Sequence, residues 1–453
     1  MKRKTVRAAR AVPRTALLAA AGALAAGVLA TALGAGTSSA AVSGTLTVQI
    51  QTGQEAQLDT YIKLFEKQYP GVTVKTTEVS QIAKTGTNLT VLSSGGAPDV
   101  GIIPTNTTVY SRLLSGGDLV PLTPVWKADD LGKYYGKSII SSLLVKGVPY
   151  VLSFDQTYYD IVYYDIPLFK KLGISVPSDH RIPSLGALDA MTTKLQKAGY
   201  DGLTIGGSSG YQASWMLDSY LDTAATPAQY ENYLTSWQPS VPVSVQYDTS
   251  GSPFLKALGA IATMGKDGMF EPGYLGISQV PQSEALFVEG RAGLLLDGDY
   301  SVAVLKADKI GFPYGWLVLP PVPGSHEQNS ISLYTGDAMG VPKDAADPQL
   351  GIDFLKVVMS EQGQRSDLMN GSLPATSNVP TSAYSALGPI VQSQIAFVAK
   401  NGGQIGWTSG APGGFAQQFT DPLVQAMLGG SDTPLQVAQK VQGQLAAFRS
   451  GKD

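Results

Sequence analysis

The chain has 453 residues, with 32 basic and 35 acidic side chains, 51 glycines, 28 prolines and no cysteine. The missing cysteine excludes disulfide bonds, thiolate metal sites, a cysteine nucleophile and a lipid-modified cysteine after a leader. A chain of this length exceeds one hydrophobic core, so we expect a folded α/β protein of two or three domains, rich in turns.

Residues 1–41 have the three-part pattern of a secretory signal peptide. Six basic residues lie in the first 14 positions, an apolar run rich in Ala, Leu and Gly follows, and small residues end at Ala40 and Ala41. Either alanine suits the position before a cleavage site. Retention of the run as a membrane anchor is the alternative, because its length is marginal for a span.

The charge after the leader excludes some partners. Removing the leader's six basic residues from the 32 leaves 26 against 35 acidic ones, a net charge of −9. Such a chain has no electrostatic reason to bind nucleic acid or an anionic membrane. We therefore expect an exported, soluble protein with no nucleic-acid partner.

The first elements after the leader predict a parallel sheet. Residues 46–50 alternate between apolar and polar and predict a strand, and apolar residues at helical spacing in 58–65 predict a helix that ends before Pro70. Residues 72–79 predict a second strand, and 100–103 a buried one. A strand–helix–strand opening is typical of parallel sheets flanked by helices.

Two later helices are expected to begin with the same pair of residue types. Asp347-Pro348 and Thr433-Pro434 each place a capping side chain before a proline at the first helical position. Apolar residues at helical spacing follow both pairs.

Residues suited to catalysis are few. The two histidines, His180 and His326, have no metal-binding spacing, so we predict neither a metal nor a cofactor. Residues 206–210 match the GxSxG pattern of serine hydrolases, with Ser208 as the nucleophile. Chance competes strongly with this match in a chain of 51 glycines. A secreted hydrolase that uses Ser208 stays open as an alternative.

Two pairs of carboxylates stand close together in the sequence. Asp155 with Asp160, and Asp297 with Asp299, could in principle serve glycoside hydrolysis, whose geometry is spatial and cannot be read from spacing. Capping of turns and surface charge are the more common roles.

Aromatic residues in or near Gly- and Ser-rich segments are the most conspicuous feature. Their flat faces can receive the C–H side of a sugar ring, while Asp, Asn and Gln bind its hydroxyls. An aromatic residue taken singly is more often part of the core. The residues in such segments are Tyr211, Trp215, Tyr220, Tyr300, Tyr334 and Trp407, and four more tyrosines crowd one stretch: Tyr158, Tyr159, Tyr163 and Tyr164.

Short motifs in a consistent order resemble the extracellular solute-binding proteins of ABC importers, specifically the large sugar-binding group similar to maltose-binding protein. Phe65 to Val74 reads FEKQYPGVTV, and Gly96 to Val100 reads GAPDV. Further matching segments are 117–122, 149–174, 287–293, 296–300 and 345–364. The chain departs from the group at Asp165, where Asn is usual, and at Tyr300, where Trp is usual.

The resemblance implies a fold of two α/β lobes, each a mixed, mostly parallel sheet flanked by helices. Three chain crossings would form a hinge, near Phe154–Tyr159, Tyr334–Met339 and Leu373–Asn378. Lobe 1 would contain residues 42–155 and 337–375, and lobe 2 residues 156–336 and 376–453.

The resemblance also implies a ligand site between the lobes and a function. The candidate ligand-binding residues are Gln54, Asn106, Asp155, Tyr211, Trp215, Asp299, Tyr300, Gly336, Asp337 and Trp407. The expected function is a monomeric receptor that binds a sugar and delivers it to the permease subunits of an ABC importer, without catalysis. A non-sugar solute such as a polyamine is an alternative, with Asp155, Asp297 and Asp299 as its carboxylates.

Overall fold

The computed structural model describes residues 42–52, 54–80, 87–237, 246–325, 330–334, 337–411 and 415–450. The predicted leader, His326 and Gly336 lie outside these ranges, so the predictions for them stay predictions. No helix within the described ranges is both long and apolar enough to cross a membrane.

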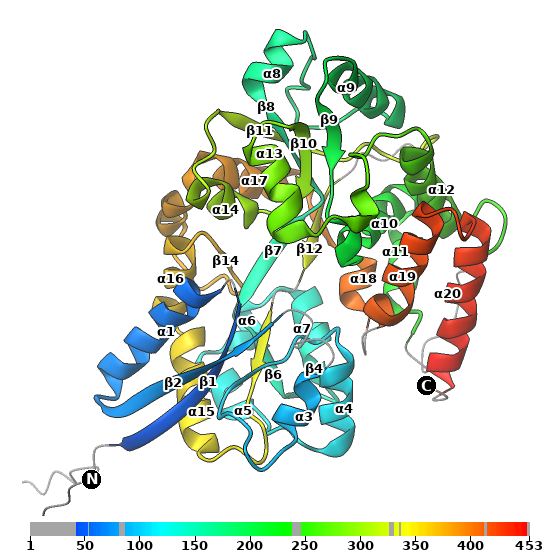
Figure 1. Ribbon diagram of the computed structural model, residues 1–453. Coiled ribbons are helices and arrows are strands. Elements are labelled where there is room, and N and C mark those ends of the chain that lie inside the picture. The colour runs from blue at the N-terminus through cyan, green and yellow to red at the C-terminus, as the bar shows by residue number, and fades with distance from the viewer. Residues whose placement is uncertain are drawn as a thin grey trace, which may run out of the picture. The chain divides into compact units, whose positions relative to one another are not determined.

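The strand–helix–strand opening is confirmed (Figure 1). Strand β1 (Ser43–Gln51) pairs in parallel with β2 (Gly71–Val79), and α1 (Glu55–Gln68) connects them. Val48 also bridges Val100 in parallel. The helix buries Leu58, Tyr61 and Phe65, because residues three or four positions apart share one helical face.

An antiparallel sheet adjoins this opening. Its order is β3 (Gly101–Ile102), β13 (Ala338–Gly340) and β6 (Val151–Ser153), so a strand from late in the chain lies between two early ones. The elements of this part of the chain also include a hairpin and six helices: β4 (Leu144–Val145), β5 (Val148–Pro149), α3 (Asn88–Leu92), α4 (Thr108–Gly116), α5 (Thr123–Ala128), α6 (Leu131–Tyr134), α7 (Lys137–Leu143) and α15 (Pro348–Met359).

A four-stranded sheet forms the centre of the second half. Its order is β11 (Tyr314–Val318), β8 (Ile161–Asp165), β10 (Ala292–Asp297) and β9 (Asp201–Thr204). Only β9 and β10 are parallel in this sheet. The helices between and after these strands are α8 (Ile166–Lys171), α9 (Leu185–Lys197), α10 (Tyr211–Ala224), α11 (Pro227–Thr235), α12 (Pro253–Lys266), α13 (Glu284–Val288), α14 (Ser301–Ala307), α17 (Gly388–Asn401), α18 (Trp407–Gly410), α19 (Asp421–Leu428) and α20 (Pro434–Arg449).

The three segments expected to be chain crossings contribute to one further sheet. Its order is β14 (Leu373–Pro374), β7 (Asp155–Tyr159), β12 (Ile331–Tyr334) and β15 (Gly403–Ile405). Strand β7 leads from β6 into β8, and Figure 1 shows it running from the sheet that contains β6 toward the sheet that contains β8. Its neighbours β12 and β14 both run antiparallel to it. The sheets are therefore mixed, but less parallel than the sequence pattern indicated, because these strands pair with partners that are distant in sequence.

Both expected helix starts are confirmed. The Asp347 side chain accepts a hydrogen bond from the backbone N–H of Leu350 at 3.0 Å, at the start of α15. Thr433 accepts one from Gln436 at 3.3 Å, at the start of α20. Each satisfies an N–H that the first helical turn leaves without a partner.

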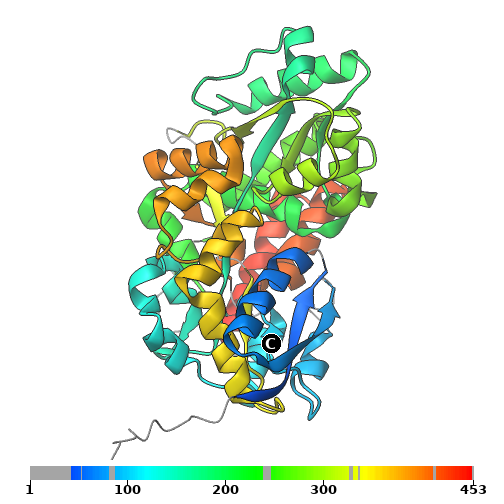
Figure 2. The same cartoon turned by 90° about the vertical axis from the view of Figure 1, so that its left-hand side faces the viewer.

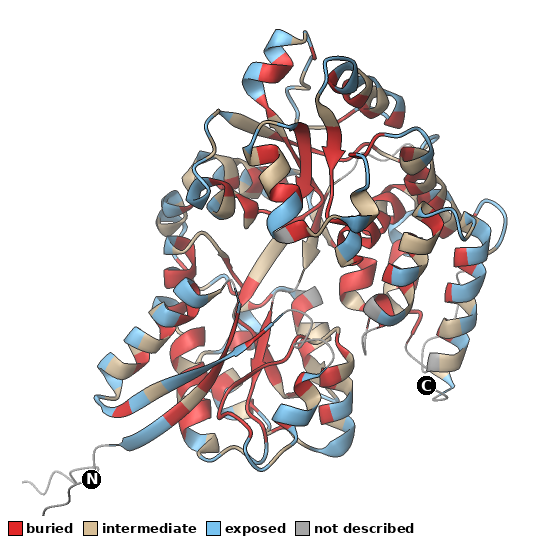
Figure 3. Cartoon of the chain, in the orientation of Figure 1, coloured by how far each residue is buried: buried red, intermediate tan, exposed pale blue. Residues whose placement is uncertain are grey.

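Buried apolar residues form three clusters. One draws on residues 46–154 and 338–375, a second on residues 162–322 and 407–445, and a third lies within residues 158–397. In Figure 3 the central strands of both halves are mostly buried. Figure 2 shows α15 and α16 (Glu361–Met369) beside α1, with which both are in contact.

Candidate ligand-binding site

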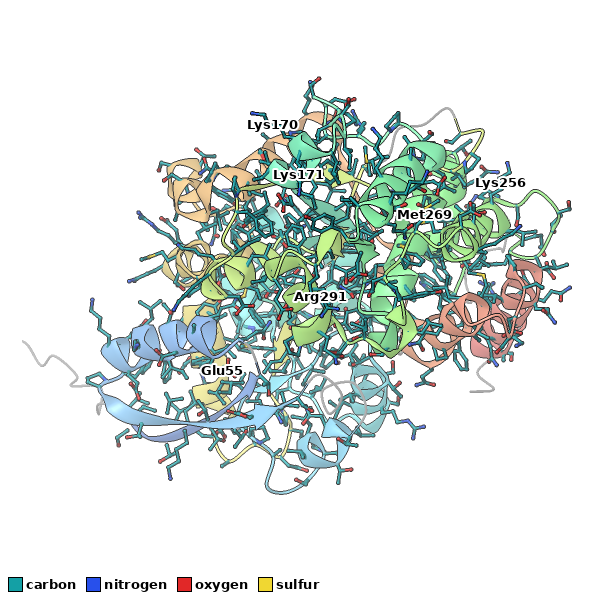
Figure 4. The ribbon with its side chains drawn as sticks, turned by 45° about the horizontal axis from the view of Figure 1, so that its top comes forward. Glu55, Lys170, Lys171, Lys256, Met269 and Arg291 are labelled. Atoms are coloured by element: carbon teal, nitrogen blue, oxygen red, sulfur yellow. The ribbon has the colours of Figure 1, made fainter. Side chains whose placement is uncertain are left out.

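Three of the predicted site residues meet directly at the crossings. The backbone N–H of Asp337 donates to Oδ1 of Asp155 at 2.8 Å, and Nε2 of Gln54 donates to Oδ2 of Asp337 at 2.9 Å. Phe154 donates its backbone N–H to the carbonyl of Asp337 at 3.1 Å. We call Gln54, Asp155 and Asp337 the hinge cluster. The exposed Glu55, which follows Gln54 at the start of α1, marks its neighbourhood in Figure 4.

One acceptor of the hinge cluster is buried without a partner. Among the described residues, Oε1 of Gln54 has no hydrogen bond although it is shielded from solvent. A buried acceptor without a hydrogen bond is unfavourable and calls for an explanation. A ligand hydroxyl that donates to this atom would supply one.

Tyr334, at the end of β12, lies close enough to the hinge cluster to respond to its charge. Burial raises the pKa of Tyr334 well above its usual value, and the carboxylates of Asp337 and Asp155 raise this pKa further. The phenol therefore stays protonated and can donate a hydrogen bond. The sequence pointed to Tyr334 only as one aromatic residue among many.

A second layer of side chains joins α1 and α16 to the first crossing. Asp367 on α16 accepts hydrogen bonds from Tyr61 and, at 3.1 Å, from Nε2 of Gln57, both on α1. Gln364 donates from Nε2 to the carbonyl of Phe154 at 2.9 Å. These contacts hold the start of β7 against α1 and α16.

A row of three aromatic rings lies where β7 ends. The ring of Trp215 is 5.0 Å from that of Tyr211 and 4.9 Å from that of Tyr159, centroid to centroid, and both pairs are tilted. Tyr211 and Trp215 are four residues apart on α10, which places them on one face of the helix. Both are only half-buried, whereas Tyr159 is fully buried and donates from its hydroxyl to Asp218 at 2.7 Å. We call these three residues the aromatic row.

Tyr300 joins the aromatic row through its hydroxyl. This hydroxyl donates to Oδ1 of Asp297 and accepts from Nε2 of Gln279, while the Tyr211 hydroxyl donates to Oε1 of the same Gln279. Burial raises the pKa of Tyr300 well above its usual value, with a further contribution from Asp297. Two predicted site residues, Tyr211 and Tyr300, are therefore brought together by one residue that sequence reasoning missed.

The structure gives Asp299 a different place from the one predicted. Its side chain is 2% exposed and accepts the backbone N–H of Tyr158 at 3.1 Å, while its own N–H donates to the Tyr158 carbonyl at 2.9 Å. Burial raises its pKa to about 8. Asp299 thus ties the loop after β10 to β7 and offers a ligand almost no surface.

Trp407 also lies away from any exposed surface, contrary to its predicted role. It is fully buried, and its ring packs against Phe254 at 5.1 Å, Trp237 at 5.6 Å and Tyr247 at 5.8 Å. The short helix α18 turns this face toward the core, so Trp407 is a packing residue. Phe415, eight residues later, is 1% exposed and packs against the same ring.

Asn106 is half-buried in the turn before α4. The next residue, Thr107, caps that helix by accepting the N–H of Tyr110 at 3.2 Å. Thr108 then accepts a hydrogen bond from Nε2 of Gln418, which is 310 positions later in the sequence. Asn106 therefore lies near a contact between the start of α4 and Gln418, which is close to the C-terminus.

The GxSxG segment lies between β9 and α10 and contains a 3-10 turn, η1 (Gly207–Ser209). Ser208 is exposed, and its N–H donates to the carbonyl of Ile277 at 2.9 Å. The described histidine, His180, stacks on Trp316 at 4.0 Å, and its Nδ1 contacts the Trp316 carbonyl at 2.9 Å. Nothing in this arrangement brings an imidazole to Ser208.

The paired carboxylates are buried, not surface charges. Asp160 lies with the hydroxyls of Ser219 and Ser332, and burial raises its pKa to about 8. Asp297 accepts from the N–H of Gly298 at 2.9 Å and from Gln279 at 2.6 Å, and burial raises its pKa to about 6. Within the described ranges, no group of three or more carboxylates and histidines could hold a metal ion.

Gln279 carried no signal that periodicity could reveal. It begins a π-helical turn, η3 (Gln279–Ser283), in a stretch without regular apolar spacing. Such turns occur often at functional sites, but they have no sequence signature. Its contacts depend on elements that are distant in the sequence.

Comparison of the sequence with known proteins relates this chain to extracellular binding proteins. A sequence model of the family described as bacterial extracellular solute-binding protein matches residues 50–365. An ABC transporter extracellular-binding protein of Pyrococcus horikoshii is 22% identical over 344 residues, which cover 73% of this chain and 71% of that protein.

Solved structures share the fold. A chitin oligosaccharide binding protein superposes with a TM-score of 0.74 at 19% identity, covering 90% of this chain and all of that one. The GacH receptor of Streptomyces glaucescens, solved unliganded and with acarbose, gives 0.70 at 19% identity over 91% of this chain and all of that one. The protein RafE in complex with raffinose gives 0.68 at 16% identity, again over 91% and all of the respective chains. At these identities the likeness establishes the two-lobed fold.

Proposed function

Because the chain belongs to the family of bacterial extracellular solute-binding proteins, we propose that it is the exported receptor of an ABC importer and that it binds a sugar or oligosaccharide between its two lobes. The observation that carries this proposal is the aromatic row, in which Tyr211 and Trp215 are half-buried. Large aromatic faces of this kind suit the apolar side of a sugar ring.

The polar half of the proposed site is the hinge cluster. Asp155 begins β7 and Tyr159 ends it, so the cluster and the aromatic row are joined by one strand. Four residues of extended chain span about 13 Å. A ligand of more than one sugar ring could therefore stack on the row and donate a hydroxyl to Oε1 of Gln54.

The proposal also includes a movement of the two lobes relative to each other. We take residues 42–155 with 337–375 as lobe 1 and the remainder of the mature chain as lobe 2. The side-by-side pairing of β7, β12 and β14 supports a hinge there. A ligand that contacts both lobes would stabilise the closed arrangement by its extra contacts in that state. The closed receptor would then deliver its ligand to the permease.

Several solved relatives in this fold are named for oligosaccharides, and this favours the same ligand class here. The ligands in their names include chitin oligosaccharide, raffinose and mannotriose. Binding and release require no proton transfer or nucleophile, so we propose a receptor without catalytic activity. We further propose that it acts as a monomer outside the cytoplasmic membrane and has no nucleic-acid partner.

Calorimetry with a panel of ligands tests the proposal. The panel contains chitotriose, xylotriose, mannotriose, raffinose and maltotriose, with spermidine as the non-sugar arm. We expect at least one sugar to bind the mature protein, and Trp215→Ala to weaken that binding. Tyr200→Ala is the matched control, because Tyr200 is a half-buried aromatic residue near Lys171 on α8 (Figure 4) and not in the aromatic row. Binding of spermidine alone would overturn the sugar assignment.

A further inference from the structure

We infer that Gln279 is a positioning residue that sets the orientation of the Tyr211 and Tyr300 rings, so that both offer a sugar their faces and no hydroxyl proton. This inference rests on the proposed function and names the residue that organises its aromatic half.

A single amide holds both tyrosines. Gln279 is 4% exposed; its Oε1 accepts from the Tyr211 hydroxyl, and its Nε2 donates to the Tyr300 hydroxyl and, at 2.6 Å, to Oδ1 of Asp297. Tyr211 begins α10, and Tyr300 follows β10. Two rings from separate elements are therefore fixed relative to one another by one side chain.

The chemistry of this position requires an amide. The arrangement uses one acceptor and two donor hydrogens on the same planar group, which Asn and Gln alone provide among neutral side chains. A carboxylate would face Asp297 without a donor. An apolar side chain would remove the acceptor of the Tyr211 hydroxyl and a donor from both Tyr300 and Asp297.

Gln279 itself is held by the glycine-rich segment before α10. Its backbone N–H donates to the Ser209 hydroxyl at 3.2 Å. A Cβ atom at Gly206 would overlap the backbone of Gln279 and the side chain of Gln212. At Gly207 a Cβ atom would lie 2.5 Å from the carbonyl oxygen of Tyr274. Gly206 thus permits close packing against the π-helical turn, and Gly207 permits close packing against the segment at Tyr274.

The hydrogen bonds of the two hydroxyls decide how the rings meet a ligand. The Tyr211 hydroxyl donates to Gln279, and the Tyr300 hydroxyl donates to Asp297 while it accepts from Gln279. Neither has a proton left to donate to a sugar. Ligand recognition by these residues therefore depends on stacking and on the angle between the rings.

Replacing the Gln279 amide with a titratable side chain of the same shape tests whether Gln279 orients the two tyrosine rings. We use chitotriose as the probe and measure its Kd by calorimetry between pH 4.5 and pH 8. For Gln279→Glu we expect Kd to rise about tenfold or more at pH 7.5 relative to the wild type at that pH. At low pH the protonated carboxyl regains the acceptor and one of the two donors of the amide, so Kd should fall back to within about threefold of the wild-type value. Gln279→Met, which cannot regain a donor, should stay weak at every pH.

Gln282→Glu is the matched control, because Gln282 lies in the same turn, is exposed, and uses only its Oε1 to accept the N–H of Ser278 at 2.8 Å. It should bind like the wild type at every pH. Equal losses for Gln279→Glu and Gln279→Met that do not depend on pH would contradict the inference.

A measurement without ligand separates this inference from the proposed function. The indole N–H signal of Trp215 in a proton–nitrogen NMR spectrum, assigned with Trp215→Phe, reports on the Tyr211 ring 5.0 Å away. Gln279→Met should shift this signal and leave those of Trp126 and Trp316 unchanged. A Trp215 signal that does not move would overturn the role of Gln279. If none of the five sugars binds the wild type, the ligand class proposed above is wrong, and the spectrum still decides the role of Gln279. If a sugar other than chitotriose binds, that sugar replaces chitotriose as the probe.

Discussion

The backbone N–H of Asp337 donates to Oδ1 of Asp155 at 2.8 Å, across 182 positions in the sequence. This contact joins the start of β7 to the segment between β12 and β13, where the chain passes a second time through the proposed hinge. The removal of this acceptor should therefore affect both folding and binding.

We predict that Asp155→Ala lowers the free energy of unfolding by about 1–3 kcal/mol, because a buried N–H loses its acceptor. Asp155→Asn keeps an oxygen at the same place and should retain most of the stability. Urea denaturation of both variants measures the difference. A loss for Asn as large as that for Ala would show that the charge, and not the hydrogen bond, matters.

We predict that Trp215→Ala weakens binding of the sugar identified by calorimetry about tenfold or more, since a stacked ring face is lost. Tyr211→Phe keeps the ring and should weaken binding by less than about threefold. The Kd values from calorimetry separate the two variants. Equal losses would indicate that binding depends on the Tyr211 hydroxyl, which holds the ring through its hydrogen bond to Gln279, as much as on the Trp215 ring.

Trp407→Ala should act on stability and not on the site. The ring is fully buried among Trp237, Tyr247 and Phe254, and removal of such a ring costs about 3–5 kcal/mol. Thermal unfolding followed by circular dichroism measures this loss. At a temperature where the variant is folded, its Kd for the sugar should match that of the wild type. A raised Kd with unchanged stability would restore Trp407 to the binding site.

Stability should fall as the pH rises from about 5 to about 8. Burial raises the pKa of Glu284 to about 8 and that of Asp299 to about 8. The folded chain therefore keeps these protons over a range in which the unfolded chain has lost them. Protonation favours the folded state below this range, and the advantage is lost as pH passes through the raised pKa values.

Glu284→Gln isolates one contributor to this pH dependence. Both carboxyl oxygens of Glu284 are buried and, within the described part of the chain, have no hydrogen-bond partner. The amide carries no charge, so the variant should be more stable than the wild type by about 1–3 kcal/mol at pH 8 and nearly equal to it at pH 5. Urea denaturation at the two pH values provides the comparison. A difference of the same size at both would rule out titration of Glu284 as its source.

Gly206→Ala should destabilise the protein severely, because its Cβ would overlap the backbone of Gln279. Gly276→Ala is the matched control: it lies in the nearby turn η2 (Tyr274–Gly276), and a Cβ there meets no atom within 4 Å. Thermal unfolding of the two variants should separate them clearly. Similar stabilities would mean that the segment at Gly206 and the π-helical turn at Gln279 can move apart at little cost in free energy.

Short-range patterns in the sequence were enough to predict the elements that depend only on nearby residues. Alternation in residues 46–50 and helical spacing in 58–65 correctly predicted β1 and α1, and Asp347 and Thr433 correctly marked the starts of α15 and α20. These patterns work because a strand, a helix and a cap each depend on neighbours within a few residues. Motifs in order along the chain were enough for the family.

The roles of individual side chains depended on contacts between distant segments. Trp215 and Trp407 both stood out in the sequence as aromatic residues near glycine and serine, yet one is half-buried in the aromatic row and the other is fully buried in the core. Asp155 and Asp299 were equally plausible, yet the first holds Asp337 and the second holds the backbone of Tyr158. Gln279 acquired its role only where α10, β10 and a π-helical turn meet. The sequence by itself determined the elements and the family, whereas tertiary packing alone decided which side chains remain accessible, because accessibility is a property of neighbours that lie far apart in the chain.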